Sequence, residues 1–519
     1  MKRFSLLLLC LSILSLFTFG VAAQEPGTFV YALRIDPETL DVQNGSGSTN
    51  TIGQFLGATL ITLDPETSAY VPWLASDWSV SEDGLTWTFH LRTDVKFHDG
   101  SPLTTADYAW TLNRAIDPEN PTYMGSLLDG MAAAEALDDT TLQITMAFPN
   151  YSLLAGLANP SLQPLSQAWV EAQGDDYGRN PLGVGPFKFV SWSTSQNVIL
   201  ERNTDYTWAP AWAEGLPQID RIEFRIIPEY ATRVAALEVG EVDFSDLQPN
   251  DAASFEGSAS LQIVSRLSAG TQNAIFMNLE REPFTDARVR QAFAQAINRD
   301  GFIAVVGQGH GAPAFSPLSS ATTGYWDGAE AAAPPYDLDA ARALLADAGW
   351  TDSDGDGILD KDGQPLIVEF KTNGDFFGTL ATVFQDQMRQ LGVQIDIQLL
   401  DVGVLLDAMD GGDYTLTASS LGLNDSQALF FEFHSSMIGF ANTGRVADPA
   451  LDAILERMSA AVSAEDNQAA SNEVQQYVIE NAYILSTFTP ERFWGVSNRV
   501  QGVIFGRTGT LYLDQASLQ

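Results

Sequence analysis

The acidic run from Asp352 to Gly363 has the residue types and the spacing of a calcium-binding loop. Carboxylates stand at alternate positions, and a glycine holds the sixth position, where such a loop turns sharply. The twelfth residue is Gly363 instead of the glutamate that closes an EF-hand, and residues 365–370 have a strand pattern. We therefore expect either a structural Ca²⁺ site or a solvated acidic turn. The ligands would be the side chains of Asp352, Asp354, Asp356, Asp360 and Asp362 and the carbonyl group of Ile358.

The histidines and serines lack the spacing of common catalytic motifs. His90, His98, His310 and His434 form no HExxH pair, and we find no Gly-x-Ser-x-Gly or Ser-x-x-Lys sequence. We predict a packing role for His98. A glycosidase, however, needs only two carboxylates. A secreted hydrolase, either glycosidase or peptidase, therefore stays open as an alternative function.

Charge and the N-terminus restrict where the protein acts. The formal net charge of −40 argues against binding to nucleic acid, which requires clustered Lys and Arg. Lys2 and Arg3 precede an uncharged run over residues 4–23, which predicts a Sec signal peptide cleaved after Ala23. A retained anchor is the alternative. Cys10, the only cysteine, lies inside this run, so we expect neither lipid attachment nor disulfides in the mature chain.

A strand, a turn and the start of a helix follow one another before residue 108. Trp87, Phe89 and Leu91 alternate with polar residues, as in a half-buried strand. The dipeptide at 99–100 predicts a turn, and Thr104-x-x-Asp107 predicts a capping box. The aromatic residues here, with Trp73 and Trp78 just before them, are predicted to pack in the core.

Later segments alternate between helix and strand patterns, which indicates α/β architecture. Asp286 is a predicted N-cap, and Asp448-Pro449 predicts a second helix start. Apolar residues at helical spacing between 380 and 391 are followed by strand-like alternation over 393–399. The Gly-rich segment 180–189 has no phosphate-loop spacing and is predicted to be a turn between strands. At 519 residues the chain is too long for one core, so we expect two or three domains.

The segment Val95 to Tyr108 resembles the signature of extracellular solute-binding protein family 5, which includes dipeptide, oligopeptide and nickel receptors of ATP-driven importers. Further similar segments run in family order from about Leu40 to Gly502; they include 180–189, 200–206, 238–243 and 278–300. The resemblance implies two hinged α/β lobes with mixed sheets and an additional domain inserted in the first lobe. It places the crossovers near 268–276 and 487–492. The expected segments are 24–60, 183–272 and 490–519 for lobe I, 61–182 for inserted domain II, and 273–489 for lobe II.

The resemblance also implies a ligand site between the lobes, where main-chain groups hold a peptide as an extra strand. By position, the first-lobe contact loop is Gly45, Ser46, Gly47 and Ser48, and the second-lobe strand is Ser420, Leu421, Gly422, Leu423, Asn424 and Asp425. Peptide-binding relatives carry Gly-Trp and then an acidic residue that pairs with the ligand ammonium. Here Leu423 replaces the Trp and Asp425 falls one residue early, so peptide specificity is an open question. Arg445 is a candidate for a ligand carboxylate.

We therefore expect a monomeric periplasmic or extracellular receptor, not an enzyme, that closes over a small solute and docks on two permeases and two ATPases. Peptide is the leading ligand class, followed by oligosaccharide or a nickel chelate. No cofactor is required beyond the possible structural Ca²⁺. A sensor without a transport role is a further alternative.

Overall fold

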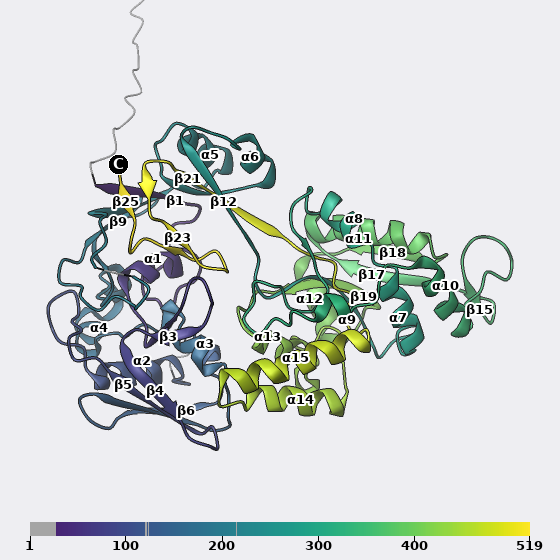
Figure 1. Ribbon diagram of the computed structural model, residues 1–519, viewed down its shortest axis with the longest axis horizontal. Helices are drawn as coiled ribbons and strands as arrows, with labels where there is room; N and C mark the ends of the chain where they lie inside the picture. Colours follow the sequence, from purple (N-terminus) through teal and green to yellow (C-terminus); the bar gives the residue numbers. More distant parts are fainter. Residues whose placement is uncertain (1–26, 120–121, 123, 214) are drawn as a thin grey trace, which may run out of the picture.

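The computed structural model describes residues 27–119, 122, 124–213 and 215–519. The predicted signal peptide lies outside them. The described chain is an α/β protein with three main sheets, as the sequence predicted, and Figure 1 shows two bodies joined by extended segments. Among the described helices, none has the length and apolar character needed to cross a membrane.

Lobe I, the body at the upper left of Figure 1, contains a seven-stranded mixed sheet with the order β12-β21-β11-β1-β10-β9-β8. β1 runs parallel to β10 and β11, and the remaining pairs are antiparallel. Helix α1 covers one face, and α5 and α6 cover the other. The elements are β1 Thr28–Leu33, α1 Ser48–Leu56, β8 Phe187–Ser193, β9 Asn197–Arg202, β10 Arg221–Ile226, α5 Tyr230–Glu238, β11 Phe244–Leu247, α6 Pro249–Ser254, β12 Leu261–Leu267 and β21 Glu491–Ser497.

Domain II continues from lobe I and has its own antiparallel sheet, β4-β5-β7-β6, with α2 packed on it. A short hairpin, β2 with β3, connects the two parts. The elements are β2 Ile61–Leu63, β3 Tyr70–Pro72, β4 Ala75–Val80, β5 Thr86–Leu91, α2 Thr105–Ala115, β6 Met131–Ala136, β7 Thr141–Met146, α3 Leu153–Leu157 and α4 Gln167–Gln173.

Lobe II, on the right of Figure 1, has the sheet order β13-β19-β17-β18 with helices on both faces. The elements are β13 Thr271–Met277, α7 Ala287–Gln295, α8 Arg299–Val305, α9 Ala329–Ala332, α10 Leu338–Asp347, β17 Ile367–Thr372, α11 Gly374–Arg389, β18 Gln394–Leu399, α12 Val402–Gly411, β19 Leu416–Leu421, α13 Gln427–Phe433, α14 Pro449–Ser459 and α15 Ala464–Glu480.

Short strand pairs complete the described fold. β14 (Ala312–Pro313) pairs with β20 (Phe488–Thr489), and β15 (Asp360–Lys361) pairs with β16 (Gln364–Pro365). In the C-terminal segment, β22 (Val500–Gln501) pairs with β25 (Ser517–Leu518), and β23 (Ile504–Phe505) pairs with β24 (Leu511–Tyr512). These hairpins return the end of the chain to lobe I.

Local signals in the sequence correctly located several helix starts. The Thr104 and Asp107 capping box is present at the start of α2. Asp286 caps α7, and Asp448 caps α14 with Pro449 in the first turn. These signals succeed because the capping hydrogen bonds join residues only two or three apart in the chain.

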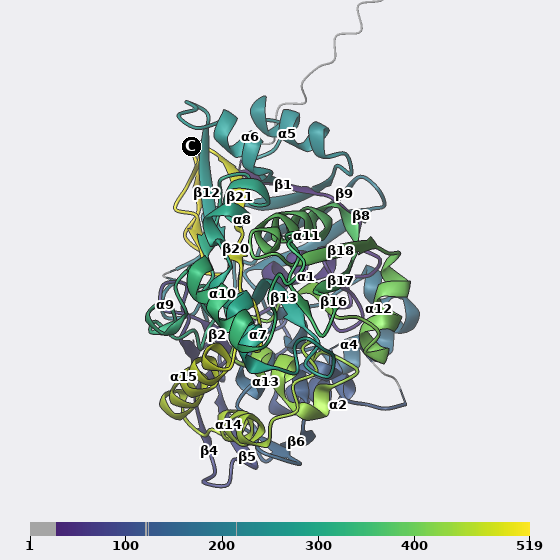
Figure 2. The ribbon, with the colours of Figure 1, turned by 90° about the vertical axis from the view of Figure 1, so that its right-hand side faces the viewer.

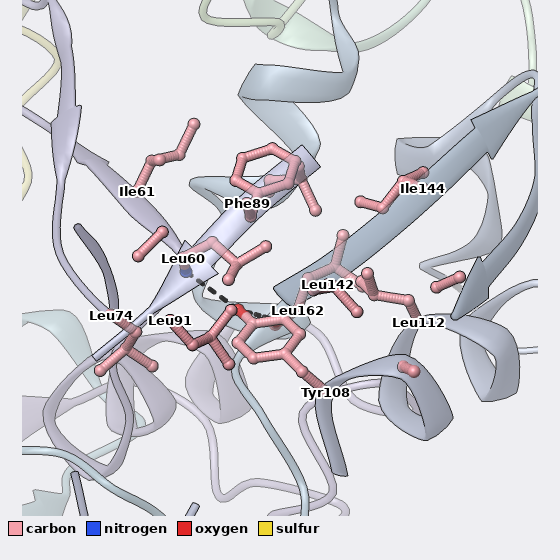
Figure 3. Packing of buried hydrophobic residues seen from close by; sticks show 14 of the residues in the cluster. Leu60, Ile61, Leu74, Phe89, Leu91, Tyr108, Leu112, Leu142, Ile144 and Leu162 are labelled. Atoms are coloured by element: carbon pink, nitrogen blue, oxygen red, sulfur yellow. Dashed lines mark hydrogen bonds between the residues drawn. The ribbon is translucent and has the colours of Figure 1, made fainter. Parts of the chain in front are cut away.

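Tyr108 joins the segment before β2 to the turn after α3. Its hydroxyl donates to the carbonyl oxygen of Leu162 (3.0 Å) and accepts from the amide of Leu60 (2.9 Å), inside the apolar core of domain II (Figure 3). The ring is fully buried. The two hydrogen bonds therefore hold the chain before β2 at a fixed position relative to the turn after α3.

His98 has the packing role predicted for it. Its ring accepts from the amide of Gly183 (3.3 Å) at Nδ1 and lies 3.1 Å from the carbonyl oxygen of Gly185 at Nε2. Burial lowers the pKa of His98 to about 4, so the ring is neutral at pH 7. A Cβ at Gly183 would lie 2.0 Å from the carbonyl oxygen of Leu56, which explains a glycine where this turn passes the end of α1.

Two crossover segments run side by side between the lobes. β12 ends at Leu267 and β13 begins at Thr271, while the return passes from β20 into β21. The amide of Ser268 donates to the carbonyl oxygen of Pro490 (3.0 Å), so the two segments are paired where they leave lobe I. They lie at the positions expected from the sequence. The exact domain boundaries stay a prediction.

The lobes also meet at a second place. Figures 1 and 2 both show α14 and α15 of lobe II reaching toward the sheet of domain II. The amide of Tyr151 donates to the carbonyl oxygen of Ser459 (2.8 Å), and the Ser152 hydroxyl donates to Gln427 Oε1 (3.0 Å). The structure therefore has the lobes in contact on the side away from the crossovers.

Candidate ligand-binding site

A cavity of about 330 Å³ lies where lobe I, domain II and lobe II meet. Helix α1 contributes polar side chains to one wall. The hairpin of β2 and β3, the segment after α3, and the C-terminal residues 508–514 form other walls. Lobe II contributes only Asn424 and Asp425. The polar and aromatic lining includes Asn50, Thr51, Gln54, Thr59, Thr62, Tyr70, Trp73, Asn159, Trp212, Asn424, Asp425, Thr508, Thr510, Tyr512 and Asp514.

The packing of α1 explains the position of its polar residues. Ile52 and Phe55 are buried toward the seven-stranded sheet, where the ring of Phe55 lies 5.8 Å from that of Phe224. Asn50, Thr51 and Gln54 line the cavity. The amphipathic pattern of one helix thus supplies both a core contact and a polar wall.

Asp425 comes from the loop between β19 and α13 and is only 8% exposed. Its Oδ1 accepts from the amide of Gln427 (3.3 Å), and the Ser152 hydroxyl lies beside it. Burial raises the pKa of Asp425 to about 6, against the opposing effect of these two donors. The geometry thus gives lobe II one carboxylate in the cavity.

Asp514, three residues after the start of β24, supplies a second carboxylate from the opposite side. Burial raises the pKa of Asp514 to about 6 as well. The sequence did not indicate this residue, because it lies in a short irregular segment without a periodic pattern or a motif. Only the return of the chain through β21 brings it to the cavity.

Aromatic rings form much of the remaining wall. The rings of Trp212 and Tyr512 pack edge to face, with centroids 4.8 Å apart. Trp73 Nε1 donates to the carbonyl oxygen of Trp208 (3.1 Å), which orients its ring. The sequence prediction of a core role was correct for Trp87, which is 2% exposed, but incomplete for Trp73, which is partly buried and lines the cavity.

Most of the contact residues expected by position lie outside this cavity. Gly45, Ser46 and Gly47 lead into α1, and Ser48 is its first residue, whose hydroxyl donates to the carbonyl oxygen of Ile35 (2.6 Å). The residues that follow them in α1 line the cavity instead. Of the second-lobe strand, Ser420, Leu421, Gly422 and Leu423 are absent from the lining, because β19 ends at Leu421 and only the following loop extends across.

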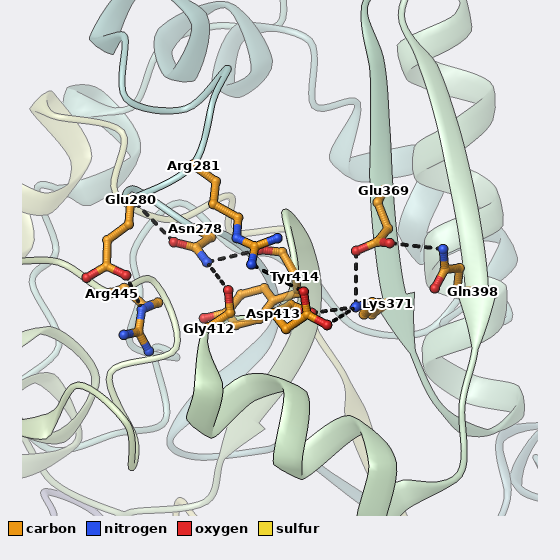
Figure 4. Close-up of polar contacts among 10 residues, drawn as sticks. All are labelled: Asn278, Glu280, Arg281, Glu369, Lys371, Gln398, Gly412, Asp413, Tyr414 and Arg445. Carbon is orange, nitrogen blue, oxygen red and sulfur yellow. Dashed lines mark hydrogen bonds and ion pairs between the residues drawn. The ribbon is translucent and has the colours of Figure 1, made fainter.

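Arg445 is engaged within lobe II and is not a lining residue (Figure 4). Its Nε donates to Glu280 Oε2 (2.5 Å). In the same region, Lys371 Nζ lies 3.0 Å from Asp413 Oδ2, beside the turn that connects α12 and β19. These ion pairs stabilise one edge of lobe II and leave Arg445 no role in the cavity.

The acidic loop lies at the far end of lobe II, between α10 and β15. Carboxylate oxygens of Asp352, Asp354 and Asp356 lie within 4.8 Å of one another, and all three residues are exposed. Asp360 instead accepts from the amide and the hydroxyl of Ser353, both at 2.8 Å. Ile358 and Asp362 are not part of the cluster. Binding of Ca²⁺ at this loop stays a prediction, and its ligands would be centred on the carboxylates of Asp352, Asp354 and Asp356.

The family described as bacterial extracellular solute-binding proteins, family 5 (middle part), matches residues 69–435. The chain is 32% identical to the glutathione-binding protein GsiB of Pectobacterium atrosepticum over 340 residues. These aligned residues cover 65% of this chain and 62% of GsiB. The chain therefore spans less than two thirds of that relative's length. It is 28% identical to the oligopeptide-binding protein AppA of Bacillus subtilis, over 80% of this chain and 75% of AppA.

Solved structures show the same fold. AppA in complex with a nonapeptide superposes with a TM-score of 0.69 at 22% identity, covering 95% of this chain and 99% of AppA. The unliganded open form of MppA, a periplasmic murein tripeptide binding protein, gives a TM-score of 0.81 at 20% identity, covering 95% and 98%. The matched family consists of binding proteins without catalytic activity, so the hydrolase alternative is wrong. The chain belongs to family 5 of the bacterial extracellular solute-binding proteins.

Proposed function

We propose that this protein is the substrate-binding component of an ABC importer and captures a small solute by closing its lobes over the cavity. The observation that carries this proposal is the origin of the cavity walls. Asn424 and Asp425 come from lobe II, and every other lining residue comes from lobe I or domain II. Because two paired crossovers join the lobes, a hinge motion there would open the cavity and release its contents.

A small peptide is the leading ligand. The volume of about 330 Å³ is at the lower end of the range for small-molecule sites, which suits a dipeptide better than a long peptide. Relatives of this chain are named as glutathione- and oligopeptide-binding proteins. A glutathione-like solute and a nickel complex are further candidates, since a relative is named as a glutathione-binding protein and a structure of the same fold, NikZ from Campylobacter jejuni, holds Ni(L-His).

The proposed setting is the periplasm or the extracellular face of the membrane, after removal of the signal peptide. The closed form would dock as a monomer on a permease and ATPase complex and reach the membrane only through it. A sensor role without transport would use the same closure, because ligand contacts to both lobes stabilise the closed state in either case.

Two measurements on the purified mature protein test this proposal. Mass spectrometry under native conditions should detect a bound small solute that denaturation releases. Small-angle scattering should show compaction when that released solute is returned to protein stripped by unfolding and refolding. A protein that carries no solute and keeps one radius of gyration with its own extract would contradict the proposal.

A further inference from the structure

The cavity contains two carboxylates and no basic side chain among its described lining residues. Asp425 enters from lobe II and Asp514 from the C-terminal segment of lobe I. The described residues offer neither carboxylate an ion pair: the groups that act on Asp425 are Ser152 and backbone amides, and those beside Asp514 are the phenols of Tyr206 and Tyr512. The site therefore has an unbalanced negative charge.

Three cations from the segments around the cavity have other partners. Arg92 forms a salt bridge with Asp94 (2.8 Å), and Arg507 donates to the carbonyl oxygen of Ser320 (2.8 Å). Lys188 lies 3.5 Å from Asp205. A counter-ion for Asp425 and Asp514 therefore has to come from the solute.

Closure of the lobes strengthens the need for a counter-ion from the solute. When lobe II closes, it carries Asp425 into the cavity that Asp514 also lines, and ionised carboxylates without a counter-charge are costly in a poorly solvated space. Burial raises the pKa of both carboxyl groups to about 6, which agrees with this environment. A cationic ligand would supply the missing counter-charge to both carboxylates, so closure becomes more favourable when such a ligand is bound.

The walls also suit a cation. Tyr70, Trp73, Trp212 and Tyr512 line the cavity, and aromatic faces attract ammonium and guanidinium groups. The amide and hydroxyl side chains of α1, together with Asn159 and Asn424, accept hydrogen bonds from such groups. An anionic solute would find donors there but no fixed positive charge.

We propose, on the basis of the receptor function above, that the solute is a dication: a small peptide or amine with two amino or guanidino groups, one facing Asp425 and the other facing Asp514. A carboxylate in the ligand would lie next to the two aspartates without a partner. A dicationic ligand class is narrower than the range proposed above: it excludes acidic peptides and net-negative thiol peptides, including the glutathione-like solute.

Isothermal titration calorimetry with four capped dipeptides of similar size tests the charge requirement at pH 7.5. The probes are lysyl-alanine amide with two positive charges, alanyl-alanine amide with one, N-acetyl-alanyl-alanine amide with none, and N-acetyl-alanyl-alanine with one negative charge. We expect affinity to fall at least about tenfold with each positive charge removed, as for a charge-assisted contact. Equal affinities, stronger binding of the anionic probe, or no binding of any probe would overturn the inference.

Single substitutions test which of the two aspartates faces each positive charge of the ligand. Asp514→Asn should remove most of the preference for lysyl-alanine amide over alanyl-alanine amide. Asp425→Asn should lower the affinity of the protein for both amides. Each variant should raise the melting temperature of the ligand-free protein or leave it unchanged, because an unpaired buried charge has been removed. Asp396→Asn, an exposed carboxylate on β18, is the matched control and should change neither quantity. A preserved charge preference in Asp514→Asn would contradict the role of Asp514.

The outcome also separates this inference from the receptor function. If native mass spectrometry identifies a neutral or anionic solute that compacts the protein, the dication proposal is wrong and the receptor proposal stands. If the protein neither carries a solute nor compacts, the receptor proposal itself is wrong.

Discussion

Tyr108 shows how a single side chain can hold two walls of a binding cavity. One hydroxyl group bonds the chain at Leu60 and at Leu162, and the cavity lining includes Thr59 and Pro160 next to them. Tyr108 ends the segment that carries the family resemblance. Its role is thus structural, and its effect on ligand binding is exerted through the backbone.

We expect Tyr108→Phe to lower the free energy of unfolding by about 1–3 kcal/mol, because the buried amide of Leu60 loses its partner. Ligand affinity should fall as well. Urea denaturation measures the first quantity. Tyr336→Phe is the control, because that side chain is 44% exposed, and an equal effect of both substitutions would refute the role of the Tyr108 hydroxyl.

Glu432 is a buried acid beside the crossover. It is 3% exposed, one oxygen accepts from the Thr271 hydroxyl, and Oε2 has no hydrogen-bond partner within the described structure. Burial raises the pKa of Glu432 from 4.5 to about 8. The unfolded chain releases this proton at lower pH than the folded protein does. Glu432 therefore stabilises the fold at low pH, and that stabilisation is lost as the pH rises from about 4.5 through 8.

Glu432→Gln should flatten this part of the stability profile, because the amide cannot ionise and its oxygen can still accept from Thr271. Melting temperatures between pH 5 and 8.5 measure the effect. The wild-type protein should lose more stability than the variant over this interval. Parallel curves would show that Glu432 does not titrate there.

The residues in the cavity differ in how far the sequence revealed them. Asp425 was identifiable, because it lies one residue before the position where peptide-binding relatives carry an acidic anchor. Asp514 was not identifiable from the sequence, because its position depends on short C-terminal hairpins that have no sequence pattern of their own. Gly45 to Ser48 stay a prediction as ligand contacts, and the lining of the cavity begins with the residues that follow them in α1.

At the scale of elements, the crossovers carry the mechanical function that we propose. Gly270 lies between β12 and β13 with a φ of 95°, a conformation that favours glycine. A Cβ there would lie 2.1 Å from the carbonyl oxygen of Leu421. The crossover thus passes directly against the end of β19, whose following loop carries Asp425.

Gly270→Ala should therefore lower the free energy of unfolding by about 1–3 kcal/mol. It should also alter ligand affinity, because the crossover must shift. Gly422→Ala is the matched control, since a Cβ at Gly422 meets no atom within 4 Å. Thermal unfolding of both variants provides the comparison, and a harmless Gly270→Ala would show that the crossover can adapt.

The acidic loop between α10 and β15 is a second element with its own prediction. Ca²⁺ added to chelator-treated protein should raise the melting temperature, by the equivalent of about 2.7 kcal/mol at a hundredfold excess over Kd. Asp354→Asn should abolish the rise, because Asp354 is one of the three convergent carboxylates. Asp396→Asn should leave it intact. No shift at millimolar Ca²⁺ would identify the loop as a solvated turn.

Elements were predictable where local signals dominate. The capped helices α2, α7 and α14 and the succession of α11 and β18 follow from capping residues and apolar spacing. The cavity was not predictable from the sequence, because its walls come from segments more than 400 residues apart. Only the tertiary fold brings Asn50 and Asp514 together.

At the scale of the whole molecule, two bodies border the cavity that we propose to hold a positively charged solute. The negative charge of the chain agrees with such a ligand through long-range attraction, although it also serves solubility. The contact between Tyr151 and Ser459 closes the side opposite the crossovers. We therefore expect a ligand held in the cavity to be released when that contact opens.

A disulfide across this contact tests closure most directly. Tyr151→Cys combined with Ser459→Cys places two thiols where a backbone hydrogen bond of 2.8 Å joins the segments, in a mature chain that otherwise has no cysteine. The measurement is the amount of co-purified solute retained after prolonged dialysis, in the oxidised and the reduced variant. We predict that the oxidised form keeps its solute and the reduced form loses it. Equal loss from both forms, with the disulfide confirmed, would contradict capture by closure of the lobes.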